Sequence, residues 1–250
     1  MVTSRTEAQA LIAAGAVLAS GVVADKPARQ VDSSEPLVVT QRPPFVGRGG
    51  HKLEAALDRF GIEVDGLAGL DAGSSTGGFT DCLLQRGAAS VVAVDVGTNQ
   101  LHERLRADPR VTVREQTDIR TLGPDEVGGP VDIVVCDVSF ISIRSVAAAL
   151  VGLARPGGRL VVLVKPQFEA GRVDVSRGKG VITDPVIWRR CVAEAIDALA
   201  GAGASIMDAM VSPLRGAEGN VEFLVSAVVD GAGIGVDEAL VDRVIAEATP

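Results

Sequence analysis

Short apolar segments alternate with helical stretches along most of this chain, and this alternation limits the possible folds more than any other feature. The apolar segments are rich in Val, Ala and Leu, as buried strands are; they are Gly66–Asp71, Ser90–Val96, Val111–Glu115, Val131–Asp137, Arg159–Lys165, Ser205–Ser212 and Val221–Val229. Helical spacing fills most of the gaps, at residues 52–60, 78–86, 100–106, 143–154 and 185–202. Because such helices cover both faces of a parallel sheet, the pattern predicts an α/β fold with a mostly parallel sheet.

The C-terminal part departs from this alternation. No helix separates the last two apolar segments, so we expect them to pair as an antiparallel hairpin at the edge of the sheet. Residues 231–250 are expected to form either a final helix or a loose tail.

A smaller unit precedes the alternating part. Ser4 is a candidate N-cap with Glu7 three residues later, which predicts a helix over Ser4–Gly15, and short strands are expected at 16–23 and 37–40. Prolines in 41–45 make a stiff connection, and a glycine-rich run follows. We therefore place a domain boundary after residue 44, with a small domain over 1–44 and a large one over 45–250.

The net charge of −8 argues against general binding of nucleic acid, but the charge is uneven along the chain. Residues 1–52 contain six Lys and Arg against four Asp and Glu, so a local basic surface is expected there. Candidate phosphate-binding residues, the last three of them in a predicted loop after Phe168, are Arg5, Lys26, Arg48, Arg172, Arg177 and Lys179.

Composition also limits the compartment and the kinds of partner. No apolar run approaches the ~20 residues of a membrane span, and the N-terminus lacks the basic and then apolar pattern of an export signal. The three cysteines are isolated and the two histidines cannot form a cluster, so neither a disulfide framework nor a metal site is expected. The sequence therefore predicts a cytoplasmic protein with no membrane partner and no metal.

Charged residues stand at or just after the ends of the first five predicted strands. They are Asp71, Asp95, Asp118, Asp137 and Lys165. Ligands of open α/β sheets bind beyond the carboxyl ends of the strands, which share one edge when the strands are parallel. We therefore expect these five side chains to surround one site.

A glycine-rich turn follows the first of these strands. Glycine permits positive φ and close approach of the backbone to a ligand, and the next helix offers its N-terminus. The turn has an aspartate before its first glycine and lacks the Gly-Lys-Ser/Thr ending of a phosphate loop, so it suits a cationic amino acid better than a pyrophosphate. Candidate cofactor-binding residues here are Asp71, Gly73, Ser74, Thr76, Gly77, Gly78, Phe79 and Thr80.

Two further acids favour a cofactor that contains adenosine. Asp95 is placed to accept hydrogen bonds from the hydroxyls of a ribose, or alternatively to cap the segment after Gly97. Asp118 is a candidate acceptor for the exocyclic amine of adenine, with Ile119 covering the ring, or alternatively a turn former. Together with the acidic glycine turn, these residues favour S-adenosylmethionine over NAD.

Two lysines and two carboxylates form a second group of candidates. Lys165 ends a strand that is otherwise apolar, and burial there would favour its neutral amine, although a lysine at a strand end can also extend into solvent. Asp137 lies one strand away, and Glu222 interrupts another apolar segment, where a charge is costly unless it is paired. Lys52 heads the first helix of the large domain, so all four are expected at the mouth of the same site.

Four segments carry a family resemblance that covers nearly the whole chain: Gly47-Arg48-Gly49-Gly50-His51-Lys52-Leu53, Asp71 through Asp81, Cys136-Asp137-Val138-Ser139-Phe140-Ile141-Ser142 and Val164-Lys165-Pro166-Gln167-Phe168-Glu169. In this order they resemble the signatures of the TlyA haemolysin family of ribosomal RNA 2′-O-methyltransferases and, more broadly, of the FtsJ-like methyltransferases. The resemblance implies a Rossmann-like domain that uses S-adenosylmethionine and acts on ribosomal RNA or ribosomal subunits. It also implies a catalytic tetrad of Lys52, Asp137, Lys165 and Glu222.

The same resemblance implies an S4-like RNA-binding domain over 1–44, beginning with its second helix near Ser4. Such domains have a further basic helix before this point, so either the sequence begins late or the domain is truncated. The implied reaction is in-line displacement at the activated methyl group by a ribose 2′-hydroxyl. Lys165 would accept or steer the hydroxyl proton, and the two carboxylates would orient the lysines. The alternatives are an NAD-dependent oxidoreductase, an RNA-binding or ribosome-binding protein without catalysis, and a non-enzymatic haemolysin.

Overall fold

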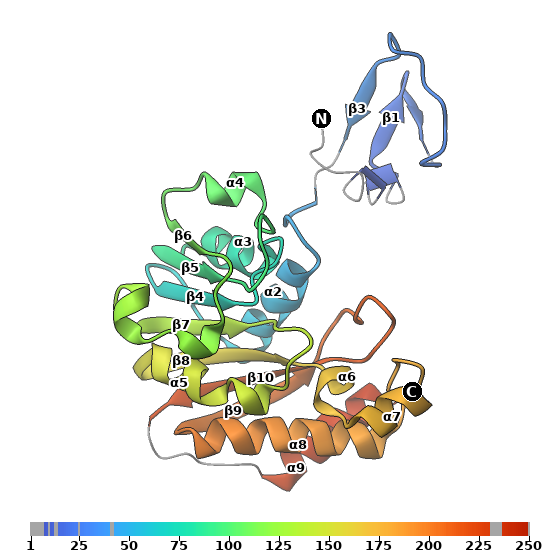
Figure 1. The fold of residues 1–250 in the computed structure, drawn as a ribbon. Coiled ribbons are helices and arrows are strands. Elements are labelled where there is room, and N and C mark those ends of the chain that lie inside the picture. Colours follow the sequence, from blue (N-terminus) through green and yellow to red (C-terminus); the bar gives the residue numbers. More distant parts are fainter. Residues whose placement is uncertain are drawn as a thin grey trace. The chain divides into compact units, whose positions relative to one another are not determined.

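The fold is taken from a computed structural model, which describes residues 8–9, 11–12, 15–24, 26–40, 43–230 and 237–249; the side chains of Arg172 and Arg177 are outside the description. The chain divides into two compact units, Met1–Pro44 and Phe45–Pro250 (Figure 1).

The small unit is a three-stranded antiparallel sheet in the order β2-β1-β3, formed by β1 (Val17–Ala19), β2 (Val22–Val23) and β3 (Leu37–Val39). Residues 8, 9, 11 and 12 are helical, and the rest of the helix predicted over Ser4–Gly15 lies mostly outside the described residues. The strand region predicted at 16–23 is divided in two, because Ser20 and Gly21 have φ of 50° and 82° and reverse the chain.

The large unit contains a seven-stranded sheet in the order β6-β5-β4-β7-β8-β10-β9. The strands are β4 (Ala68–Ala72), β5 (Ser90–Val94), β6 (Val111–Arg114), β7 (Val131–Cys136), β8 (Ala154–Val164), β9 (Ala204–Val211) and β10 (Phe223–Val229). The first five are parallel, whereas β10 pairs antiparallel with both β8 and β9. The predicted parallel sheet with an antiparallel hairpin at its edge is therefore confirmed.

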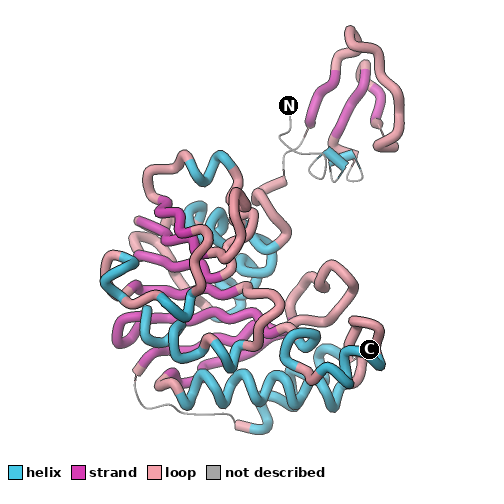
Figure 2. The backbone as a smooth tube through the Cα atoms, in the orientation of Figure 1, coloured by secondary structure: helices cyan, strands magenta, loops and turns pink. Residues whose placement is uncertain are grey.

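Helices cover both faces of this sheet (Figure 2). They are α2 (Gly49–Phe60), α3 (Gly78–Gln85), α4 (Glu103–Arg106), α5 (Ala147–Leu153), α6 (Pro166–Glu169), α7 (Arg172–Arg177), α8 (Pro185–Gly201) and α9 (Glu238–Ala248), with 3₁₀ turns η1 (Ile119–Thr121), η2 (Pro124–Val127) and η3 (Ile143–Ser145). Along β8, Leu160 and Val162 join the core under α5, α8 and α9, while Val161 and Leu163 join the core under α2 and α3. This alternation explains why the strand is apolar throughout.

Several predicted boundaries are wrong for local reasons. The helix expected at 100–106 is only the short α4, because the Glu115 carboxylate accepts hydrogen bonds from the amides of Asn99, Gln100 and Leu101 and holds them in a loop. The helix expected at 143–154 begins as η3 and stops at Leu153, since β8 already starts at Ala154.

Two further segments, after Phe168 and at the C-terminus, also bear on the predictions. The first differs from the expected form, and the second adopts one of the two forms expected. The segment after Phe168, predicted as a loop, contains α7, and in the C-terminal segment the helix α9 forms rather than a loose tail. Within the described residues, no helix is both long enough and apolar enough to cross a membrane.

Candidate active site

The candidate active site lies at the carboxyl edge of the parallel strands. The antiparallel strand β10 begins at this edge, because Phe223 pairs with Val164 at the end of β8. Glu222, just before β10, therefore reaches the same edge as Lys165, just after β8. The topology thus brings together residues that are far apart in the sequence, as the strand-end argument predicted.

Two ion pairs form the centre of the site: Lys52 with Glu222 is buried, and Lys165 with Asp137 is partly exposed through the Asp137 side chain, which is 23% exposed. Lys165 Nζ is 2.6 Å from Asp137 Oδ1 and donates a hydrogen bond to Ser139 Oγ at 2.8 Å. Lys52 Nζ is 2.5 Å from Glu222 Oε2, and the Gln167 amide also contacts Glu222. Lys52, Lys165 and Glu222 are 7%, 8% and 3% exposed. Each buried cation therefore has a carboxylate partner.

The two pairs interact with each other through Asp137. Burial raises the pKa of the Asp137 carboxyl, the charges of Lys165 and Lys52 act to lower it, and the charge of Glu222 acts to raise it. Lys52 thus influences a carboxylate that is not its nearest partner. The four side chains are one electrostatic cluster.

Three cavities meet at this cluster, with volumes of about 430, 210 and 370 Å³, and Asp137 and Ser139 line all three. Lys165 lines the two smaller cavities, whereas Phe140 lines the two larger ones. The 370 Å³ cavity also contains Lys52 and Glu222. A group bound in one cavity could therefore meet a group bound in another beside Lys165.

The glycines of the turn make room for neighbouring parts of the chain. Gly73 has φ of 82°, and a Cβ there would lie 2.8 Å from the carbonyl oxygen of Asp137. A Cβ on Gly77, at φ of 96°, would lie 2.3 Å from Leu105 Cδ1. From the sequence, these glycines were expected to let the backbone approach a ligand closely. In the structure the space beside each is filled by protein, although the backbone of Gly73 still lines two cavities.

A second glycine contact positions Lys52. A Cβ on Gly78, at the start of α3, would lie 2.9 Å from the backbone nitrogen of Gly50 and 3.2 Å from the Cα of Gly49. Backbone therefore packs on backbone where α2 and α3 begin. This close contact sets the position of the first turn of α2, which carries Lys52.

Asp71 lies beneath the turn and lines none of the three cavities. Its Oδ2 accepts hydrogen bonds from the backbone nitrogen of Thr80 at 2.9 Å and from Thr80 Oγ1 at 2.7 Å, which fixes the first turn of α3. Burial raises the pKa of Asp71 to about 7, and the hydrogen bonds from Thr80 oppose this shift. Gly77 and Thr80 also lie outside the cavities, whereas Gly73, Ser74, Thr76, Gly78 and Phe79 line the 210 Å³ one.

The residues expected to hold adenosine line the 430 Å³ cavity together: Asp95, Asp118 and Ile119. Asp95 accepts hydrogen bonds from the backbone nitrogens of Ser75 and Gly97, each at 2.7 Å, and so ties the glycine turn to the end of β5. Asp118 is paired with Arg120, whose hydrogen bonds lower the pKa of the Asp118 carboxyl to about 2. The carboxylate of Asp118 is thus ionised and already partly occupied.

Of the predicted phosphate-binding residues described in the large unit, Arg48 and Lys179 line none of the three cavities. Arg5 is outside the described residues, as are the side chains of Arg172 and Arg177, which belong to helix α7. Lys26 is exposed in the small unit, and Lys179 is exposed with φ of 50°. Arg48 donates a hydrogen bond to the carbonyl oxygen of Arg215 at 2.6 Å and so joins the start of α2 to the loop before β10.

Among the cavity residues that were missed as individual candidates are Ser139, Phe140 and Gln167. Ser139 and Phe140 lie two and three residues after the strand-end Asp137, and this proximity was the available signal. Phe140 is 90% exposed with φ of 65°, and its ring lies 5.0 Å from that of Phe168. No sequence pattern predicts that a phenylalanine adopts this left-handed backbone conformation. In the described part of the chain, no group of three His, Cys, Asp or Glu could hold a metal ion.

Comparisons with known proteins agree with this geometry. Residues 45–228 match the family model of the FtsJ-like methyltransferases. A relative from Mycobacterium tuberculosis named 16S/23S rRNA (cytidine-2'-O)-methyltransferase TlyA is 48% identical over 222 residues, which are 88% of this chain and 82% of the relative.

Two solved structures are similar as well. A Streptococcus thermophilus protein, provisionally described as a hemolysin, superposes with a TM-score of 0.82 at 37% identity, covering 99% of this chain and 90% of its own. An S-adenosylmethionine-dependent methyltransferase from Mesorhizobium loti shares the fold, with a TM-score of 0.53 at 19% identity over 73% of this chain and all (100%) of its own. The chain therefore belongs to the FtsJ-like methyltransferases and, within them, to the TlyA family.

Proposed function

We propose that this protein transfers a methyl group from S-adenosylmethionine to a ribose 2′-hydroxyl of ribosomal RNA. The observation that carries the proposal is the arrangement of two ion pairs, Lys165 with Asp137 and Lys52 with Glu222, where three cavities meet. The substrate class is suggested by the printed name of the Mycobacterium tuberculosis relative. Because ribosomal RNA is the substrate in this proposal, the proposed location is the cytoplasm.

The chemistry of two cavities supports S-adenosylmethionine as the cofactor. The 430 Å³ cavity combines apolar Ile119 and Val138 with the acids Asp95 and Asp118, as a nucleoside requires. The 210 Å³ cavity is more polar and lies beside the hydroxyls of Ser74 and other turn residues, as an amino-acid group requires. When bound, S-adenosylmethionine supplies an electrophilic methyl group.

The 370 Å³ cavity is the proposed place of the ribose. Lys165 lines it together with Lys52 and Glu222, so its side chain is placed beside the substrate hydroxyl. As an ammonium group Lys165 can only donate a hydrogen bond to that hydroxyl, and after giving up one proton its neutral amine can take the proton of the hydroxyl. Asp137 and Ser139 hold Lys165 Nζ in one position, which supplies the alignment on which such a reaction depends. Glu222 keeps the ammonium group of Lys52 paired within the same cavity.

The small unit is proposed to be an S4-like RNA-binding domain. The proposed phosphate contacts are Arg5 and the exposed Lys26 of this unit, and Arg48, Arg172, Arg177 and Lys179 of the large unit. Ionic contacts of this kind weaken with added salt, and they add affinity without sequence preference.

Phe140 is expected to stack on a base of the bound RNA. Phe140 is 90% exposed and lines both larger cavities. Stacking on a base would remove the apolar surface of its ring from water, which is favourable. Stacking of a base on an aromatic side chain contributes about 1–3 kcal/mol, so Phe140→Ala should raise the KM for RNA by roughly 5–150-fold. Steady-state rates at varied RNA concentration measure this effect. The control is Phe60→Ala, on α2 and remote from the cavity linings, and an unchanged KM in Phe140→Ala would contradict the stacking role.

The proposed function is tested by transfer of labelled methyl from S-adenosylmethionine to small ribosomal subunits, large ribosomal subunits, naked ribosomal RNA and tRNA. We expect label on ribosomal RNA in at least one of the first three substrates. Label on tRNA alone, or no label from protein that binds the cofactor, would refute the substrate assignment.

A further inference from the structure

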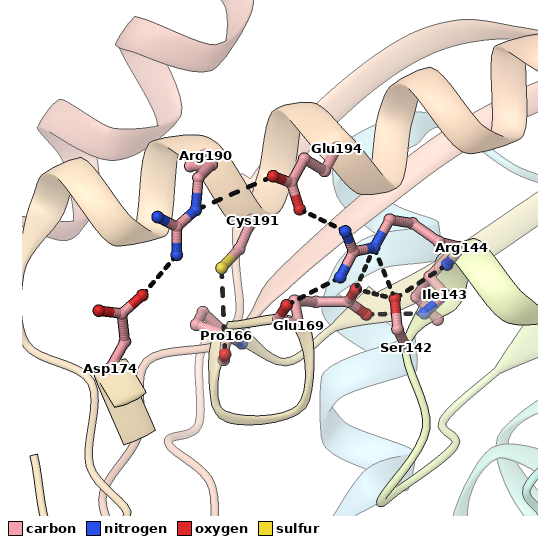
Figure 3. Close-up of polar contacts among 9 residues, drawn as sticks. All are labelled: Ser142, Ile143, Arg144, Pro166, Glu169, Asp174, Arg190, Cys191 and Glu194. Carbon is pink, nitrogen blue, oxygen red and sulfur yellow. Dashed lines mark hydrogen bonds and ion pairs between the residues drawn. The ribbon is translucent and has the colours of Figure 1, made fainter. Parts of the chain in front are cut away.

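Glu169, the last residue of α6, is a buried carboxylate outside the three cavities. Its side chain is 1% exposed, although it stands only four residues after Lys165. Both of its oxygens accept hydrogen bonds from the segment that follows β7: Oε2 from Ser142 Oγ at 2.5 Å and Oε1 from the backbone nitrogen of Ile143 at 2.7 Å (Figure 3). The mechanism above gives this carboxylate no role.

These hydrogen bonds join the two loops that form the centre of the site. The loop after β7, residues 137–142, carries Asp137, Ser139 and Phe140. The loop after β8 is here taken as residues 165–169, which include the short helix α6, and it carries Lys165 and Phe168. Lys165 contacts Asp137 and Ser139 across the two loops, and the two phenylalanine rings also pack across them. Glu169, the last residue of the second loop, is hydrogen-bonded to Ser142, the last residue of the first. The two loops are therefore joined at their ends as well as at the contact between Lys165 and Asp137.

Glu169 is in turn held from the outer side. Arg144 Nη2 donates a hydrogen bond to the backbone carbonyl of Glu169 at 3.1 Å, and Arg144 Nη1 lies 2.9 Å from Glu194 Oε2 on α8 (Figure 3). Arg144 Nε is also 3.9 Å from Glu169 Oε2, which partly compensates the buried charge. Burial raises the pKa of Glu169, and the hydrogen bonds from Ile143 and Ser142 oppose that shift. The Arg144 and Glu194 side chains are 47% and 36% exposed, so this outer ion pair is open to water and holds Glu169 less firmly than its hydrogen bonds from Ser142 and Ile143 do.

We infer that Glu169 is a positioning residue for methyl transfer, because it sets the distance between Lys165 and the loop that carries Asp137 and Ser139. This inference rests on the proposed function. Glu169 lines none of the cavities and acts through Ser142 and Ile143 rather than on the reacting atoms. A displacement of about 1 Å at a catalytic group can cost about 10²-fold in rate.

The first test separates rate from binding. Glu169→Ala is expected to lower kcat, counted per cofactor-binding site, by about 10–100-fold, with KM for RNA changed less than kcat. Glu169→Gln has the same shape, keeps an acceptor for the amide of Ile143 and can donate to Ser142 Oγ, so it should restore most of kcat. The matched control is Glu194→Ala, whose carboxylate is 36% exposed and, among the described residues, pairs with Arg144 and Arg190. Its kcat should stay within about twofold of the wild-type value.

The second test does not depend on activity. The backbone amide of Ile143 donates a hydrogen bond to Glu169 Oε1. In Glu169→Ala the exchange of this amide hydrogen with solvent should therefore be about tenfold faster or more. In Glu169→Gln and Glu194→Ala the exchange rate should stay close to that of the wild type. Unchanged exchange, wild-type kcat in Glu169→Ala, or an equal loss in Glu194→Ala would each overturn the inference. Failure of the proposed function would appear separately, as absence of methyl transfer by the wild-type protein, and the exchange measurement would still decide whether Glu169 holds the loops.

Discussion

Replacing Lys165 with arginine is expected to slow methyl transfer by about 10²–10⁴-fold while cofactor binding is kept. Arginine retains a positive charge beside Asp137, so the carboxylate stays paired and the fold is preserved. A guanidinium group does not lose its proton in proteins, so Lys165→Arg cannot accept the proton of the ribose hydroxyl. Single-turnover transfer measures the rate, and titration with S-adenosylmethionine measures binding.

Two other variants show which property of Lys165 matters. Lys165→Ala removes both the amine and the charge, and is expected to be as slow as Lys165→Arg but less stable. Arg155→Ala removes a cation that pairs with Asp132 at the opposite end of the sheet, and should react at the wild-type rate. If Lys165→Arg kept more than about a tenth of the wild-type rate, Lys165 would act through its charge alone, and the proton-accepting role would be wrong.

Glu222→Ala is expected to destabilise the large unit by about 3–5 kcal/mol, since removing one partner of a buried ion pair leaves the other charge uncompensated. Lys52 and Glu222 are 7% and 3% exposed, so an unpaired Lys52 ammonium would be hydrated only in part, from the side of the 370 Å³ cavity that both residues line. Trp188, the one tryptophan of the chain, is 4% exposed and packs near Phe223. Its fluorescence during urea unfolding therefore reports the stability of this unit.

The double variant Lys52→Met with Glu222→Leu separates stability from function. Replacing both charges by apolar groups of similar size is often neutral or stabilising, so most of the lost stability should return. Methyl transfer should nevertheless be lost in the double variant, because the ammonium group of Lys52 is absent from the 370 Å³ cavity. A double variant that reacts at the wild-type rate would limit this ion pair to a structural role.

The large sheet and the cluster of charges could be predicted because both follow from short-range pattern. Apolar segments joined by helices predict parallel strands, and a charged residue at the end of such a strand has to reach the shared edge. Lys165 and Asp137 were found in this way. Glu222 required more: its place at this edge depends on the antiparallel direction of β10, which the missing helix before it indicated.

Other features depend on contacts between segments, which no local pattern encodes. The sequence contains Glu169 and Ser142, but their hydrogen bond joins residues 27 positions apart. The turn glycines were identified, yet the reason for Gly78 is the backbone of α2, which only the folded chain brings near. The conformation of Phe140 is likewise set by the loop around it.

The most direct test of the central claim is the chemical position of the transferred methyl group. RNA treated with the protein and methyl-labelled S-adenosylmethionine would be digested to nucleosides and analysed by mass spectrometry, with Lys165→Arg in parallel. We expect the label on the ribose of a 2′-O-methylated nucleoside with the wild-type protein, and its loss with Lys165→Arg. Label on a base, or the same amount of ribose label from both proteins, would contradict the account.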